Sequence, residues 1–228
     1  GDLLLAMAGA FDLEKLQKII KDVAPPEAEG VGKKIEETIG VPANDLWQAF
    51  TGDFSIAING IEGESMIPVE LFIGLGVDND AIQEALMGTV ENMATVNQEG
   101  DFFVINIQGI EIYSGIVNGI WVITNANGYK DKVKDGGLKA SLPDTKFQEF
   151  AGGSMGMFLN LDLNSYPSMI TQQLSQNPEQ NEWLEYLTES FSYLGISGGN
   201  YLSTATLKTN KPNENSLYTI MKMTEMMD

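Results

Sequence analysis

The chain has 228 residues, 43% of them hydrophobic, which suits one large or two small folded domains and is too apolar for a disordered protein. Its formal net charge is −19, and it contains no arginine, histidine or cysteine. Such a charge disfavours nucleic acid and anionic membrane faces as partners. The missing residue types exclude a disulfide framework, a cysteine-ligated metal and an imidazole base.

The first part of the chain predicts one strand followed by helices. Residues 3–11 form an apolar run, and Asp12 stands where it would cap a helix with apolar residues on one face. A short second helix is expected within 30–40. A third helix, with Trp47 on its apolar stripe, is predicted to end through a left-handed cap at Gly52, where helical spacing changes to alternation.

An antiparallel meander is expected next. Five strands are predicted, at 53–61, 66–76, 101–108, 110–117 and 120–125, with one helix between the second and third. In the first of them, apolar residues alternate with polar or small ones. Asn118-Gly119 is a strong signal for a two-residue hairpin. The polar motif at 78–80 caps the intervening helix, and residues 129–134 predict one more helical turn.

The polar, glycine-rich stretch 135–144 predicts a boundary between a first half, 1–137, and a shorter second half, 138–228. The second half is expected to contain strands and helices in the order strand 154–161, helices 165–176 and 179–190, and strands 191–198, 201–209 and 216–223.

The second half resembles the first in sequence. Aligned identities are Met7 with Met157, Asp12 with Asp162, Leu13 with Leu163, Thr51 with Thr188, Phe54 with Phe191 and Ser55 with Ser192. The predicted fold class is therefore α+β: an antiparallel sheet with helices packed on one face, arranged as two degenerate related halves. The alternative is two unrelated α+β stretches that share only glycines at the ends of their helices and strands.

The motifs favour no catalytic chemistry. The segments 152–156 and 195–199 match G-x-S-x-G, but a nucleophile elbow needs a histidine base that the chain does not contain. Glu70 and Asp162 are the acids with the most apolar neighbours, as a hydrolase carboxylate would need, although solvent exposure and helix capping explain them better. The acidic motif at 78–80 lacks the ligand spacing of a calcium loop.

Two groups of residues suggest ligand contact. Trp121 follows the hairpin turn and is a possible contact for a ligand such as a sugar. The methionines near the C-terminus suit either an adaptable apolar surface or one face of a core strand, and they are Met221, Met223, Met226 and Met227. The sequence predicts no catalytic residue, no metal site and no cofactor.

The junction from Phe50 to Ile58 and the steps Phe11-Asp12-Leu13 and Leu161-Asp162-Leu163 resemble those of Bacteroidetes proteins predicted to be lipoproteins that carry a domain of unknown function. In those proteins a Gly-Asp pair leads into an alternating strand in each half. The match here is partial, because Gly153 and Ser190 stand where that pattern has Asp. The resemblance implies export, a lipid-anchored cysteine upstream of Gly1, and a periplasmic or cell-surface location. It implies no activity.

We expect a non-enzymatic binding or scaffold module outside the cytoplasm, with an unknown protein, glycan or apolar ligand as partner. Such a module predicts an exposed apolar or aromatic patch. One alternative is a carboxylate-dependent hydrolase acting on glycans. The other is a carrier for an apolar ligand, suggested by the methionines and by the small strand residues Ala6, Ala8, Ala10 and Gly156.

Overall fold

A computed structural model describes residues 2–23, 36–37, 40–61, 67–91, 94–134, 150, 154–174, 178–199, 202–211 and 213–225. The chain forms two compact units. One unit contains Gly1–Ala8, Ile56–Glu70 and Leu142–Asp228, and the other contains Gly9–Ser55 and Leu71–Ser141. The predicted second helix and the predicted boundary at 135–144 fall mostly or wholly outside the described residues.

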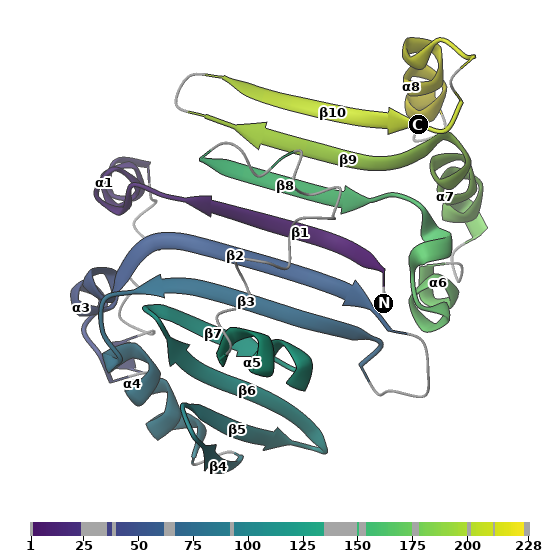
Figure 1. Cartoon of the computed structure of the whole chain (residues 1–228). Coiled ribbons are helices and arrows are strands. Elements are labelled where there is room, and N and C mark those ends of the chain that lie inside the picture. The colour runs from purple at the N-terminus through teal and green to yellow at the C-terminus, as the bar shows by residue number, and fades with distance from the viewer. Residues whose placement is uncertain are drawn as a thin grey trace. The chain divides into compact units, whose positions relative to one another are not determined.

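The strands of the described part form one ten-stranded sheet in the order β10-β9-β8-β1-β2-β3-β7-β6-β5-β4, and neighbouring strands run antiparallel (Figure 1). Their bounds are β1 Leu3–Ala10, β2 Phe50–Gly60, β3 Val69–Val77, β4 Thr95–Glu99, β5 Phe102–Ile107, β6 Ile110–Val117, β7 Ile120–Thr124, β8 Met155–Asn160, β9 Phe191–Gly198 and β10 Ser203–Thr209. The antiparallel sheet and the mixed α and β character are as predicted.

The described helices stand between groups of these strands and after the last one. They are α1 Leu13–Val23, α3 Ala43–Ala49, α4 Ala81–Val90, α5 Asn127–Lys134, a 3-10 turn η3 Leu163–Ser165, α6 Ser168–Leu174, α7 Pro178–Ser190 and α8 Ser216–Glu225. Asp12 opens α1 as expected, because its Oδ1 accepts the Lys15 N–H at 3.0 Å. The Asn118-Gly119 hairpin is also confirmed, since both residues have positive φ, 53° and 75°.

The structure corrects the prediction that α3 ends at Gly52. The helix ends at Ala49, and Phe50 is already extended. Gly52 does have a positive φ, 97°, but it lies within β2. Its carbonyl accepts the Phe11 N–H at 3.0 Å, and a Cβ there would lie 2.1 Å from the Phe11 carbonyl oxygen. Close approach of another backbone therefore explains the glycine, rather than helix capping.

Two further corrections concern strands. The meander contains one strand that was not predicted, β4, whose polar residues show no apolar alternation and which pairs with β5. The predicted strand 216–223 is a helix, α8. The Asn215 side chain accepts the Leu217 N–H at 2.9 Å and so caps the first turn, which overrides the β propensity of the tyrosine, threonine and isoleucine that follow.

Each unit has a core of its own. In the unit that contains β7 and α4, Trp121 and Ile82 pack with Ala49 and Val77. In the unit that contains β8 and β9, Phe150 and Phe158 pack with Ala6, with Leu3, Ala8 and Tyr193 at the edge of the cluster. The small residues Ala6 and Ala8 thus belong to or border a cluster that contains two phenylalanines, and this packing does not itself support the carrier hypothesis.

Candidate functional site

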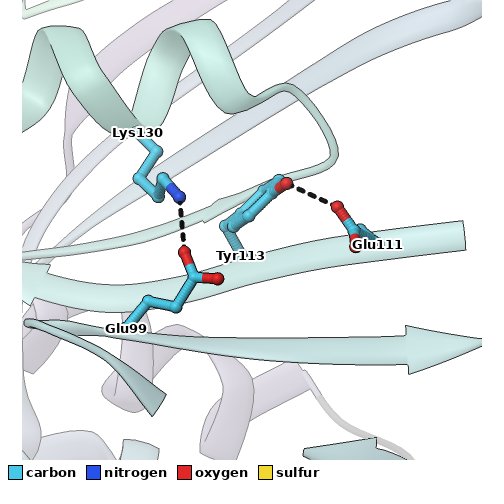
Figure 2. A network of polar contacts seen from close by, with 4 residues as sticks. All are labelled: Glu99, Glu111, Tyr113 and Lys130. Carbon is cyan, nitrogen blue, oxygen red and sulfur yellow. Dashed lines mark hydrogen bonds and ion pairs between the residues drawn. The ribbon is translucent and has the colours of Figure 1, made fainter. Parts of the chain in front are cut away.

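A buried lysine forms the centre of a polar network in the unit that contains β4 to β7. The side chain of Lys130, on α5, is 9% exposed, and its Nζ lies 3.0 Å from Glu99 Oε2 at the end of β4. The same Nζ lies 4.5 Å from the centroid of the Tyr113 ring on β6. The Tyr113 hydroxyl donates to Glu111 Oε2 at 2.7 Å. Figure 2 shows these four side chains, which link α5 to two strands of the meander.

The Lys130 ammonium and the Tyr113 hydroxyl both have partners within this network, and this limits their use in acid–base chemistry. The hydrogen bond to Glu111, burial and the nearby charges of Glu111, Glu99 and Asp131 raise the pKa of Tyr113 to about 12. The phenol therefore stays protonated at neutral pH and serves as a hydrogen-bond donor. The lysine is committed to an ion pair and an aromatic ring. This arrangement favours a role in holding α5, β4 and β6 together over acid–base catalysis.

The raised pKa of Tyr113 predicts a loss of stability in alkali. Folded Tyr113 holds its proton more tightly than the unfolded chain, whose phenol has the usual pKa of 10.0. The contribution to the free energy of unfolding is therefore complete below pH 10.0 and is lost as the pH rises toward about 12. In Glu111→Gln, phenolate absorbance should show Tyr113 titrating at a lower pH than in the wild type. Tyr113→Phe identifies its signal, and unchanged titration in Glu111→Gln would contradict the assigned cause.

Trp121, the predicted ligand contact, lies in the core. Its side chain is 4% exposed, and its indole Nε1–H donates to Ser114 Oγ at 3.0 Å. The ring has apolar neighbours and its one polar atom is bonded. A contact between Trp121 and a ligand stays a prediction.

The candidate hydrolase acids and serines occupy structural positions. Asp162 Oδ1 accepts the Asn164 N–H at 3.0 Å and so caps η3, and Glu70 lies half-buried on β3. Ser154 donates to the Gly198 carbonyl at 3.2 Å, and Ser197 lies within β9 rather than at a strand-to-helix turn. The motif at 78–80 caps α4 through Asn79, whose Oδ1 accepts the Ala81 N–H at 3.1 Å.

The described residues include no group of three or more carboxylates that could hold a metal ion. In the same part of the chain, no helix is both long and apolar enough to cross a lipid bilayer.

The feature of α8 that the sequence analysis missed is its inverted burial. Among the α8 side chains that the structure describes, Thr219 is the buried one, with an exposed fraction of 0%. Its carbonyl accepts the Tyr186 hydroxyl of α7 at 3.2 Å. Four apolar side chains of the described part of α8 face outward instead, with exposed fractions of 62% for Leu217, 62% for Tyr218, 36% for Ile220 and 54% for Met221. We call these four residues the α8 face.

A comparison with α4 shows how unusual this surface is. Asn79 and Asn215 open α4 and α8 with the same side-chain bond. Counted from each asparagine, Gln83 and Thr219 occupy the same position, and both are buried. Ile82 and Tyr218 also correspond, but Ile82 is 4% exposed and Tyr218 is 62% exposed. The asparagine before each helix was the sequence signal that could have identified α8 as a helix.

The chain matches no known family model, no curated protein and no solved structure.

Proposed function

We propose that the protein is a non-enzymatic binding module that contacts the apolar surface of a protein partner through the α8 face. The observation that carries this proposal is the outward position of Leu217, Tyr218, Ile220 and Met221 around a buried threonine. A contiguous apolar surface of this kind is costly to leave in water and is typical of interaction sites. It also corresponds to the exposed patch that the sequence-based hypothesis requires.

The packing around α4 supports a protein partner for this surface. Ile82 of α4 packs with Trp121, which lies on β7 of the meander. Buried Gln83 donates to the Ser114 carbonyl of β6 at 3.1 Å. On α8, by contrast, Tyr218 corresponds to Ile82 and is 62% exposed. A partner that presents a strand with apolar side chains would give α8 the environment that α4 already has.

We also propose that the chain consists of two related halves. The predicted placement of all helices on one face is not part of this proposal, because the neighbouring β6 residues Tyr113 and Ser114 contact α5 and α4, respectively, and neighbouring strand residues point to opposite faces. The order β1-α1-α3-β2-β3-α4 recurs as β8-α6-α7-β9-β10-α8. In the sheet, β1-β2-β3 and β8-β9-β10 extend in opposite directions from neighbouring β1 and β8. Aspartates cap the first turn after β1 and β8, and asparagines open the last helices. Phe50 begins β2 and Phe191 begins β9, so each half has a phenylalanine at this helix-to-strand junction.

The proposed location is the periplasm or cell surface, with attachment through a lipid upstream of Gly1. Its support is the partial sequence resemblance to predicted lipoproteins. Fractionation of cells that express the full-length protein, with protease added to intact cells, tests the location independently of the binding function.

Crosslinking from α8 tests the binding function, and the natural lack of cysteine makes single-cysteine variants selective. A photocrosslinker attached to the thiol of Met221→Cys in cells should give one discrete adduct. Unlabelled wild type should compete for it, whereas a Leu217→Glu/Met221→Glu competitor should be at least about tenfold weaker, because two charges would be buried in an apolar contact.

The matched control carries the same crosslinker at Lys18, an exposed residue of α1. Equal yields from both positions, or competition by the double glutamate variant as strong as that by wild type, would reject the α8 face as a binding surface.

A further inference from the structure

We propose that the partner is a second copy of this chain, joined by antiparallel pairing of β10 with β10 across a two-fold axis. This inference rests on the proposed function, since it names what covers the α8 face. In the described part, β10 is the last strand of the sheet and has a neighbour on one side only, β9.

The hydrogen-bond pattern shows which groups of β10 are free to pair. The Gly199 N–H donates to the Leu202 carbonyl at 2.9 Å, so these two residues form a bonded pair in the β9–β10 register. Bonded and non-bonded pairs alternate in an antiparallel ladder. Thr204, Thr206 and Lys208 therefore bond to β9, whereas Ser203, Ala205 and Leu207 direct their N–H and C=O groups away from it.

The bonds on the other side of β9 give the same assignment. The Leu161 N–H donates to the Ser192 carbonyl at 2.9 Å, and the β8–β9 register continues from that pair. Leu194, Ile196 and Gly198 consequently bond to β8, which leaves the alternate residues of β9 for β10. The outward groups of β10 form a template for an added strand.

The first half of the chain shows how an added strand would also cover the helix. There, β3 leads to α4, and β7 pairs antiparallel with β3 so that Trp121 lies opposite Leu75. Trp121 packs with Ile82 of α4. The first residues of β7 therefore lie beside the last residues of β3, and at that point a side chain of β7 contacts α4.

The same arrangement follows if β10 pairs with its copy around Ala205. Ser203 then lies opposite the partner's Leu207, and Leu202 lies opposite the partner's Lys208. Leu202 is 75% exposed, the largest fraction among the exposed large hydrophobic residues of the described part. Two-fold pairing places it beside the end of the partner's β10 and next to the partner's α8 face, as Trp121 lies beside α4. Each copy gives and receives this contact, as an isologous interface requires.

Charge also favours this end of the chain for contact between copies. Two chains of net charge −19 repel each other. Residues 190–228 contain three lysines and three acidic residues, so their net charge is zero and the whole excess lies on residues 1–189. Between Glu189 and Glu214 there is no acidic residue, and this stretch includes all of β9 and β10. An interface built there adds the least repulsion.

Sedimentation of the full chain at increasing concentration tests the pairing. The wild type should form dimers, and Ala205→Pro should weaken dimerisation at least about 100-fold, because it removes an outward N–H on each copy at the centre of the interface. The β9–β10 bonds do not use this N–H, and proline is tolerated on edge strands. The control Ala205→Thr keeps the N–H and should dimerise like the wild type. A monomeric wild type, or an equally stable dimer of folded Ala205→Pro, would overturn the inference.

A mixing experiment tests the contact without altering the strand. Leu202→Glu and Met221→Lys should each be monomeric alone, and an equimolar mixture should dimerise, because one glutamate then meets one lysine while the other contact remains apolar. Failure of the mixture to dimerise would contradict the two-fold arrangement. If the wild type stays monomeric while the crosslinker at position 221 captures another protein specifically, the second-copy inference fails and the binding function stands.

Discussion

Gly52→Ala should lower the free energy of unfolding by at least about 3 kcal/mol. The residue has a φ of 97°, which alanine adopts only with strain, and the added Cβ would lie 2.1 Å from the Phe11 carbonyl oxygen. Relief requires moving the end of β1 away from β2. That movement would break the bond from Phe11 N–H to the Gly52 carbonyl and disturb the stacked rings of Phe11 and Phe54.

Urea unfolding measures this effect, with Gly109→Ala as the matched control. Gly109 has a similar φ of 88°, but nothing lies within 4 Å of the position that a Cβ would take there. The control should cost only about 1 kcal/mol, the conformational part of the penalty. Equal costs for the two variants would show that the contact with Phe11 contributes nothing.

Gly195→Ala should cost about 3 kcal/mol for a different reason, overpacking of the β8–β9 core. The new methyl group would lie 2.1 Å from Cζ and 2.2 Å from Cε1 of the Phe150 ring. Phe150 is 5% exposed and packs with Phe158 and Ala6, so its ring has little room to move.

A double-mutant cycle identifies the cause. Phe150→Leu removes the ring atoms that the methyl group meets, so the double variant should be clearly more stable than the sum of the two single effects predicts. Gly198→Ala is the control on the same strand, because its nearest contact is an ordinary 3.4 Å, and it should cost far less. Additive effects of the first two substitutions would rule out the steric explanation.

Local patterns predicted much of the sheet. Short apolar segments located β5, β6 and β7, and the Asn118-Gly119 turn fixed the β6–β7 register, because only those residue types readily adopt two successive positive φ angles. β4 escaped prediction because its pairing with β5, rather than its own polar sequence, makes it a strand. β-strand formation depends on such tertiary context.

The α8 error has a specific cause. Leu217, Tyr218 and Ile220 resemble strand residues, and an apolar helix face is expected to point into the core, so the inverted helix has no ordinary sequence signature. Extending the repeat one element further would have aligned Asn79 with Asn215 and predicted a helix. Even that alignment would have predicted a buried Tyr218, because its exposure depends on what packs beside the helix.

The polar network was equally inaccessible to sequence analysis. Lys130 and Glu99 are far apart in the chain. Trp121 bonds to Ser114 because β6 pairs with β7. Trp121 follows a hairpin turn, a position that is often exposed, and only the packing of α4 against β7 buries it.

The proposed binding surface depends on the orientation of α8, and thiol modification of single-cysteine variants measures that orientation most directly. We predict that Met221→Cys in dilute, monomeric protein reacts with a soluble maleimide about as fast as a free thiol, while Thr219→Cys is strongly protected. Fast reaction at position 219 together with protection at position 221 would show that the apolar face points into the core, and would contradict the proposed binding surface.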